Sequence, residues 1–263
     1  MAVAANAAST TRRAVLQSAG PTLFGVATLL LLGLIWEWAV DIGWVSPFVA
    51  PAPSAIVQSF PGLIEDEGLF EALLRTFLET FCAAGLAMCL GVPIGWWLHR
   101  SPWAGPAYET WVASCAAAPL VLLYPLFLVI FGRSSATIVA MSTLTGLTPV
   151  VLKTKEGLDG TRRVLIDVGR SYGLGQGTLF WKIMLPAAVP TIANGVRLGL
   201  IFALISVVGV EFLINFGGMG ELIDDLAQRW EIPKMYGAIF FVILTSVAFF
   251  YITEKLEKWL RPV

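Results

Sequence analysis

Ionisable and polar side chains inside long apolar segments are the residues of this sequence that could do chemistry. Two such segments hold most of them: Thr145 and Thr148 in one, and Asn194, Arg197 and Glu211 in the other. Polar groups at membrane depth are costly, and they normally face the interior of a helix bundle or a water-filled cavity. We therefore expect these five residues to line a translocation path for a polar solute.

No enzyme signature accompanies these residues. The sequence contains no G-x-x-x-x-G-K-[ST] or H-E-x-x-H pattern. His99 is the single histidine and stands beside Arg100 at the end of an apolar segment, where a structural role is the more common one. The three cysteines all lie inside apolar segments and do not have the spacing of a zinc site. We expect no catalytic residue, metal site or cofactor on this chain; an intramembrane enzyme using Glu211, Arg197 or His99 is the alternative.

A polar segment, residues 167–190, interrupts the apolar character of the chain. It carries Arg170, Lys182 and four closely spaced glycines, and Leu185-Pro186 stands where the sequence becomes hydrophobic again. A short amphipathic segment bounded by glycines between long apolar runs is typical of a helix lying across a membrane face. We expect a partner outside the bilayer to act on the chain at this segment.

The composition sets the environment of both candidate sites. Of the 263 residues, 57% are hydrophobic and 13% are charged, and the mean hydropathy is +0.79. Soluble domains carry about twice this charged fraction, so the sequence predicts an integral membrane protein. The net charge of −1 gives no support for a nucleic-acid partner.

Six segments are apolar enough to be membrane-spanning helices, each of which needs about 20 residues. They are residues 21–41, 76–98, 108–131, 136–153, 189–216 and 235–254. The predicted fold is therefore all-α, with six transmembrane helices. By helical rise, Glu211 lies toward the outer end of the fifth span and Arg197 toward its inner end, so the two cannot pair within one helix.

Two of these spans carry features that affect helix packing. The second has small residues at four-residue spacing from Ala83 to Gly95, which let another helix approach closely, in the same subunit or in a neighbouring one. Pro119 and Pro125 interrupt the third span. Each proline removes a backbone hydrogen bond, so we expect a kinked helix there.

The distribution of Lys and Arg predicts the orientation. With the N-terminus inside, inner segments hold twelve of these residues and outer segments four. Both termini and the polar segment are then cytoplasmic, residues 1–20 form a cytoplasmic segment, and residues 21–263 form a single transmembrane domain. Arg12-Arg13 loosely resembles a twin-arginine export signal, but the apolar segment that follows is too long, so we expect an uncleaved first span.

Two predicted outer loops, residues 42–72 and 217–234, are rich in acidic residues. The first contains the run Glu65-Asp66-Glu67 after several prolines, and the second contains Glu221, Asp224, Asp225 and Glu231. These charges either are simply solvated or form a docking surface for a soluble partner, because charge complementarity steers encounter.

Several residues occur in the order and spacing of a known family. Gly173, Ile183, Leu185 and Pro186 fit a cytoplasmic loop signature that reads E-A-A, three residues, G, nine residues, I, one residue, L-P, although Asp-Val-Gly at residues 167–169 departs from E-A-A. Further matches are Leu90–Gly95, Pro119–Gly132, Thr148–Gly157, Gly195–Arg197, Glu211 and Gly218–Gly220, with Lys153 where Asn is common. From about residue 77 to 223 the chain thus resembles permeases of ABC importers that serve nitrate, sulfonates, taurine and related anions.

This resemblance implies a type I ABC importer-like transmembrane domain in a bacterial inner membrane. Its coupling helix, about 167–177 in a loop at about 154–188, would dock on a cytoplasmic ATPase. The implied partners are a second permease subunit, as in a homodimer, two ABC ATPase subunits carrying ATP and Mg, an external substrate-binding protein and membrane lipid. The residues implied in coupling are Asp167, Gly169, Arg170, Gly173, Leu174, Gly175, Ile183, Leu185 and Pro186.

The solute implied by the resemblance is small and anionic, of the nitrate, sulfonate, taurine or aromatic carboxylate class. A membrane scaffold that anchors a soluble complex through residues 154–188 without transport is the second hypothesis. Co-expression with an ATPase partner separates the two, because substrate-stimulated ATP hydrolysis that needs this segment supports transport. If the segment couples ATP hydrolysis to transport, Gly173→Arg should block close approach and abolish uptake while leaving membrane insertion intact.

Overall fold

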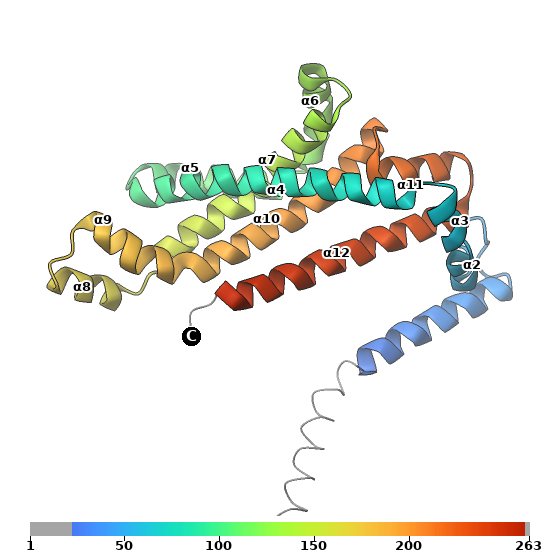
Figure 1. The fold of residues 1–263 in the computed structure, drawn as a ribbon, viewed down its shortest axis with the longest axis horizontal. Coiled ribbons are helices and arrows are strands. Elements are labelled where there is room, and N and C mark those ends of the chain that lie inside the picture. Colours follow the sequence, from blue (N-terminus) through green and yellow to red (C-terminus); the bar gives the residue numbers. More distant parts are fainter. Residues whose placement is uncertain (1–22, 261–263) are drawn as a thin grey trace, which may run out of the picture.

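The structure is a computed structural model that describes residues 23–260, with side chains to residue 255, and every regular element in that part is a helix (Figure 1). The predicted cytoplasmic segment 1–20, with Arg12 and Arg13, lies outside the described residues, as do the side chain of Lys258 and all of Arg261. The predicted all-α fold is confirmed.

The helices vary widely in length. In chain order they are an unlabelled first helix over Leu23–Asp41, α2 (Pro53–Gln58), α3 (Phe60–Glu65), α4 (Leu69–Arg100), α5 (Ala104–Ala117), the short 3-10 helix η1 (Leu120–Leu123), α6 (Tyr124–Phe131), α7 (Ser135–Asp159), α8 (Arg163–Ser171), α9 (Gln176–Leu179), the π-helical turn η2 (Phe180–Met184), α10 (Leu185–Ile214), α11 (Gly218–Gln228) and α12 (Ile232–Leu260).

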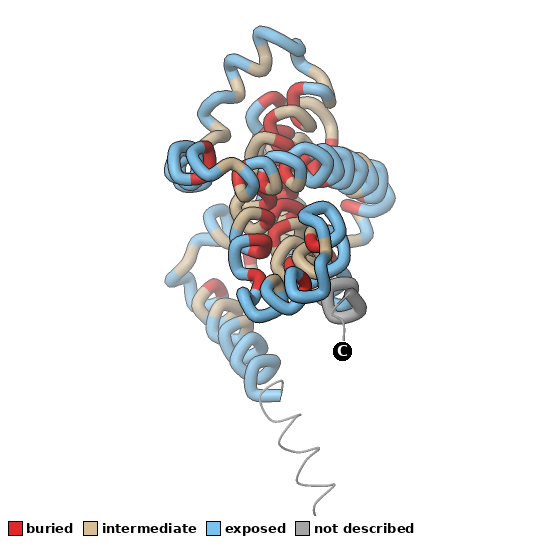
Figure 2. The backbone as a smooth tube through the Cα atoms, turned by 90° about the vertical axis from the view of Figure 1, so that its left-hand side faces the viewer, coloured by how far each residue is buried: buried red, intermediate tan, exposed pale blue. Residues whose placement is uncertain are grey.

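The core is built from α4, α7 and α10, which run along the length of the molecule (Figure 1). Viewed from one end, the buried residues gather at the centre (Figure 2). The small residues of α4 face α7: a methyl group on Gly91 would come 2.7 Å from Val150, and one on Gly95 would come 2.6 Å from Thr154. A methyl group on Gly146 of α7 would come 2.7 Å from the carbonyl oxygen of Gly199 on α10. The stripe of small residues therefore packs helices within one subunit.

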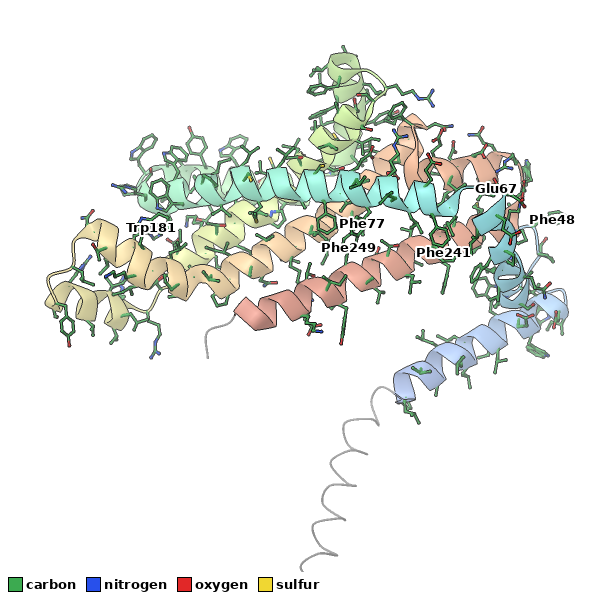
Figure 3. All side chains as sticks on the ribbon, viewed as in Figure 1. Phe48, Glu67, Phe77, Trp181, Phe241 and Phe249 are labelled. Atoms are coloured by element: carbon green, nitrogen blue, oxygen red, sulfur yellow. The ribbon has the colours of Figure 1, made fainter. Side chains whose placement is uncertain are left out.

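α12 covers this core from one side through aromatic side chains. The rings of Phe77 on α4 and Phe249 on α12 stack with centroids 5.0 Å apart (Figure 3). The first helix, Leu23–Asp41, extends away from the bundle, and only 6% of its most apolar window is buried within the chain. Its apolar surface is therefore available to lipid or to a second subunit.

The third predicted span, 108–131, is not one kinked helix. It consists of α5 and the pair η1 and α6, which meet at an angle of 88° near Pro119. The residue before a proline is driven to extended backbone, and Ala118 has ψ 141°, so α5 ends there. Within residues 23–260, five helices are long and apolar enough to cross a membrane, and a sixth crossing results if this bent pair counts as one.

Four span boundaries lie well outside their predicted positions, and one of them is the end of α12 at Leu260 instead of 254. α4 begins seven residues before 76, because Gly68 in left-handed backbone (φ 65°) lets the chain enter the helix at Leu69. α7 continues past 153 to Asp159. Helical structure leads into α10 from Gln176, through α9 and η2, so the fifth span begins before 189. Charged and polar residues extend these helices beyond the apolar window that hydropathy detects.

The two acidic segments predicted as loops contain helices. α2 and α3 occupy the first, and α11 occupies the second. They meet at one end of the bundle around a cluster of buried residues that includes Leu63, Leu69, Met219 and Leu226. This end lies opposite the end that carries α8 and α9 (Figure 1).

Candidate functional site

The polar segment folds into an arm, residues 163–184, that projects from one end of the bundle (Figure 1). Its first helix, α8, spans Arg163–Ser171. The predicted coupling helix at about 167–177 therefore had the wrong bounds: helix begins four residues earlier and ends at Ser171. Four glycines after Asp167 suggested a loose segment, but only one of them ends the helix.

Gly173 ends α8 in a Schellman motif. Its φ is +71°, a left-handed conformation that costs other residues about 1 kcal/mol or more. The amide of Leu174 donates to the carbonyl of Gly169 (3.1 Å), and the amide of Gly173 donates to Arg170 (2.9 Å). A side chain at residue 173 would meet no atom within 4 Å. The glycine is thus required by the backbone turn, not by the close approach that the sequence suggested.

Close approach occurs at Gly169 instead. This residue is buried, and an added methyl group would lie 2.6 Å from Cδ1 of Ile183 and 2.7 Å from Cδ1 of Leu179. The backbone of α8 therefore rests directly on the side chains of η2 and α9. Gly175 and Gly177 have open space around them. Gly175 is the N-cap of α9.

The outer face of α8 is apolar. Val164, Val168 and Tyr172 stand at i, i+4 and i+8, and 66%, 48% and 83% of their surfaces are exposed. The predicted contact residues Asp167 and Arg170 are also exposed on α8. Sequence reasoning named these charges and missed the apolar stripe beside them, although its four-residue spacing is the ordinary signal of one helix face.

The arm joins α10 without a break in helical structure. Ile183 lies in the π-helical turn, and Leu185 and Pro186 form the first turn of α10. Pro186 sits at a first-turn position, where the missing amide hydrogen costs little. Helical structure from Gln176 to Ile214 thus links the arm to the centre of the bundle.

A cleft of about 1050 Å³ separates the arm from the rest of the bundle. Trp96 and His99 of α4 line it on one side, and Phe180 and Trp181 on the other. Trp181 marks this end of the molecule in Figure 3. Arg170 of α8 also lines this cleft, so the cleft extends to the first helix of the arm.

An ion-pair network fixes the bundle next to the arm. Asp159, the last residue of α7, lies 2.5 Å from Nδ1 of His99 and accepts a hydrogen bond from Lys155 (2.6 Å). Lys155 also pairs with Glu109 of α5 (3.0 Å). His99 thus joins α4 to α7, which agrees with the structural role that its position suggested.

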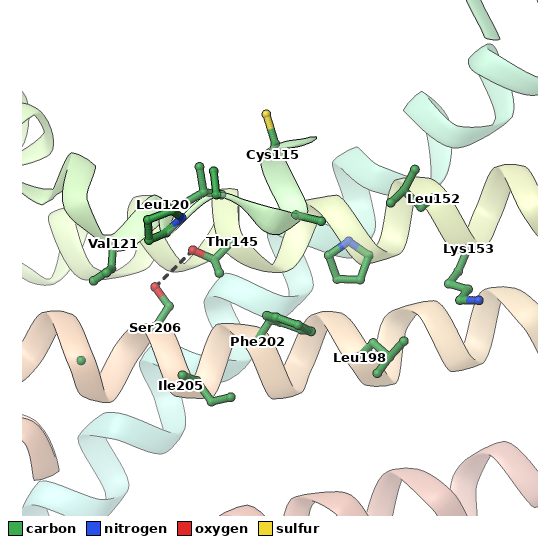
Figure 4. Close-up of a pocket in the computed structure, with 15 residues that line it drawn as sticks. Cys115, Leu120, Val121, Thr145, Leu152, Lys153, Leu198, Phe202, Ile205 and Ser206 are labelled. Carbon is green, nitrogen blue, oxygen red and sulfur yellow. Dashed lines mark hydrogen bonds between the residues drawn. The ribbon is translucent and has the colours of Figure 1, made fainter. Parts of the chain in front are cut away.

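The centre of the chain contains a cavity of about 470 Å³ between η1, α7 and α10 (Figure 4). Its walls are mostly apolar and include Leu120, Phe202 and Ile205. Thr145 and Ser206 bring hydroxyl groups into it and lie 3.3 Å apart. Lys153 lies at one end, where its ammonium group is held 2.6 Å from Glu156. The cavity can hold a small solute with one polar or charged group.

The other four predicted path residues do not line this cavity. Thr148 is buried, and its hydroxyl is 3.4 Å from the carbonyl of Leu144. Arg197 packs 3.9 Å from the ring of Phe250 on α12. Asn194 lies one turn from the cavity residue Leu198 on α10, and Glu211 is fully buried near the opposite end of the bundle. Of the five predicted path residues, Thr145 is thus the one that lines this cavity.

The opposite end carries a charged network. Glu67, labelled in Figure 3, accepts hydrogen bonds from Arg229 (2.6 Å) and Lys234 (2.8 Å). The hydrogen bonds from these two cations hold the pKa of Glu67 below its ordinary value. The carboxylates around it in turn raise the pKa of Arg229. Part of the acidic surface predicted for partner docking is thus already paired within the chain.

Comparison with known proteins places the chain among transport components. The family described as "Binding-protein-dependent transport system inner membrane component" matches residues 87–262. A Bacillus subtilis protein assigned as an aliphatic sulfonates transport permease is 29% identical over 233 residues, which cover 86% of this chain and 83% of that protein. The Escherichia coli taurine transport system permease is 22% identical over 242 residues, covering 90% and 88%.

Solved structures share the fold. The MetNI methionine ABC transporter in an inward-facing conformation superposes with a TM-score of 0.65 at 16% identity, covering 73% of this chain and 95% of that chain. An amino acid ABC transporter solved with histidines gives a TM-score of 0.63 at 18% identity, covering 76% and 97%. The helix arrangement of this chain is therefore that of ABC importer transmembrane subunits.

Proposed function

Because the chain belongs to the family of binding-protein-dependent transport system inner membrane components, we propose that it is the permease subunit of an ATP-driven importer for a small anionic solute. The arm carries this proposal: a short helix with an exposed apolar stripe is seated on helical structure that runs into the wall of the central cavity. Such an element can pass a push from a soluble partner to the solute path.

The partner at the arm would be a cytoplasmic ATPase. Val164, Val168 and Tyr172 offer an apolar ridge for a groove on that subunit. Asp167 and Arg170, which lie together beside this ridge, offer charged contacts. The excess of Lys and Arg at this end of the chain supports a cytoplasmic location. ATP and Mg would bind to the ATPase, not to this chain.

Movement of the arm would reach the cavity through α10. Gly169 presses on Ile183 of η2, and helical structure continues from there to Phe202 and Ser206 in the cavity wall. A rigid displacement of α8 would therefore tilt one wall of the cavity against α7. Rigid-body tilting of helices around a central site is a common way to alternate access between two sides of a membrane.

A second copy of the chain and an external binding protein would complete the importer. The exposed apolar surface of Leu23–Asp41 supports contact with a second subunit. The end that carries α11 would then face outward, toward the binding protein. A sulfonate-like anion is supported by the transport names of two relatives and by Lys153 in the cavity lining. A scaffold without transport would need no such cavity, so it is the less favoured function.

The test is to reconstitute the chain with its ATPase and binding protein and to change the ridge. Val168→Asp should abolish solute-stimulated ATP hydrolysis and uptake, because a charge would enter an apolar contact. The matched control is Thr178→Asp, an exposed position of α9 outside the ridge. Equal activity of both variants would show that α8 does not couple to the ATPase.

A further inference from the structure

Glu211, which the cavity does not use, is sealed inside the junction of α4, α10 and α11. None of its surface is exposed. The hydroxyl of Thr76 on α4 is 2.8 and 2.9 Å from its two carboxyl oxygens. The amide of Gly220, in the first turn of α11, donates to it at 2.9 Å. Groups from α4 and α11 thus both bind this carboxyl group, which links the two helices to α10.

The glycine-rich turn before α11 covers this carboxyl group. Gly217 and Gly218 have φ values of +71° and +78°, and a methyl group on Gly218 would overlap the carboxyl group of Glu211. The next amide, of Met219, donates to the hydroxyl of Thr76 at 2.8 Å. The turn is thus shaped around the carboxyl group and leaves no room for a larger ligand above it.

A second carboxyl group lies against the first. Glu79 is one turn along α4 from Thr76, its side chain is 7% exposed, and it is within hydrogen-bonding reach of Glu211. One of its oxygens, Oε1, is 3.4 Å from Nε of Arg75. The other, Oε2, is buried and has no hydrogen-bond partner. A buried, unpaired acceptor of this kind is uncommon and costly.

The charges around the pair do not balance two ionised carboxylates. Arg75 is the nearest cation, but 37% of its side chain is exposed, and it also bonds to Ser135 (3.3 Å) and lies 4.6 Å from the Phe216 ring. The N-terminus of α11 adds a partial positive charge. Other charged side chains close by are acidic: Glu71 of α4 lines a pocket with Arg75, and on α11 Glu221 accepts from the amide of Gly217 and Asp224 binds Asn215.

We propose that Glu79 and Glu211 form a proton-binding site that holds one proton between them. Two carboxylates that share a buried position cannot both stay ionised, because their repulsion is not screened by water. With one proton, a carboxyl O–H on one residue donates to the carboxylate of the other. That single hydrogen bond uses the unpaired Oε2 of Glu79 and removes one negative charge from the junction.

The bound proton would hold the helices of this junction together. While it is bound, α4, α10 and the first turn of α11 are held by one connected set of hydrogen bonds. If it leaves to bulk water at alkaline pH, two negative charges face each other beneath the turn at Gly218, and the contacts of α11 weaken. The site is independent of the arm and of the transport proposal, since it concerns the opposite end of the bundle.

The dependence of thermal stability on pH tests this site, and proton linkage gives the direction of the change. A group that binds its proton more tightly in the folded protein than in the unfolded chain adds stability at low pH, and that stability is lost as rising pH removes the proton. The full-length protein in lipid nanodiscs should therefore lose thermal stability from neutral to alkaline pH. Glu79→Gln keeps an N–H donor but cannot ionise, so it should lose this part of the pH dependence.

Glu71→Gln is the matched control, because it removes an exposed carboxyl group from the same helix and should keep the wild-type profile. Infrared spectroscopy gives a second measurement, which is made on the wild-type protein and does not depend on whether the variant folds. The wild-type protein should show a carboxylic-acid carbonyl band that disappears at alkaline pH. The proposal would be overturned if that band were absent, or if Glu79→Gln still lost thermal stability at alkaline pH. It would also be overturned if thermal stability depended on the Na⁺ concentration and not on pH.

Discussion

Gly169 of α8 lies directly against Ile183 of the π-helical turn, so closely that a methyl group at residue 169 would come 2.6 Å from the Ile183 Cδ1 atom. This contact is the seat through which the arm meets the helical structure that leads into α10. A glycine is required because any side chain would lift α8 away from that structure.

Enlarging Gly169 tests the seat. Gly169→Val should cost about 1–3 kcal/mol of local packing and displace α8, because the new methyl groups overlap Ile183 and Leu179. We expect uptake and solute-stimulated ATP hydrolysis to fall together while membrane insertion is unchanged. Gly177→Val is the control, since residue 177 has open space around it. Wild-type uptake by Gly169→Val would contradict the seat.

Gly173 gives a different prediction, because its constraint is the backbone. Gly173→Arg should still reduce uptake, now because left-handed backbone costs an ordinary residue about 1–2 kcal/mol and frays the end of α8. Gly173→Asn should retain more activity, since Asn tolerates this conformation better. Uptake measured for both variants separates the two explanations: if close approach were the constraint, Asn would be as harmful as Arg.

The stripe of small residues on α4 predicts a third result. Gly95→Leu should destabilise the bundle by several kcal/mol or prevent folding, because its first side-chain atom would already lie 2.6 Å from Thr154 and 2.7 Å from the carbonyl of Val151. Gly85→Leu, on the same helix but facing outward with open space, is the control. Thermal unfolding in detergent measures both. Equal unfolding temperatures would contradict the packing of α4 on α7.

Acidic pH should weaken the end that carries α11. The pKa of Glu67 is lowered by its hydrogen bonds to Arg229 and then Lys234, so its contribution to stability is present above its unfolded pKa and is lost as pH falls through the lower folded value. Glu67→Gln should lose about 1 kcal/mol at neutral pH and show a flatter acid profile. Glu65→Gln, an exposed neighbour, should behave as wild type. Thermal unfolding across acidic pH checks this, and an unchanged acid profile in Glu67→Gln would refute it.

The sequence predicted the bundle well because long apolar runs and small-residue spacing report burial in lipid and against neighbouring helices. It placed the stripe from Ala83 to Gly95 correctly on a packed face. Breaks in those runs were less informative. Pro119 and Pro125 suggested a kink, but the 88° bend depends on how η1 packs on α7.

The candidate sites were only partly predictable for a related reason. Gly169 and Gly173 were both identified, yet their separate roles depend on a side-chain contact and a backbone angle that spacing does not encode. The sequence places Glu79 one turn from Arg75, but its burial against Glu211 depends on how α4 and α10 face each other.

The cavity gives the last prediction, which concerns the solute. Lys153 is the one cationic residue among those that line the cavity, and Glu156 holds its ammonium group at 2.6 Å. An anion that enters would compete with Glu156 for this ammonium group, which offers the positive charge of the cavity lining. Lys153→Gln should therefore raise the KM for uptake of an anionic solute by about tenfold, which corresponds to roughly 1.4 kcal/mol, and should leave basal ATP hydrolysis unchanged. Glu156→Gln is the matched control, because it frees the ammonium group, and its KM should stay equal or fall. If both variants transport the anion with wild-type KM, Lys153 does not contact the solute, and charge selection must occur on another subunit.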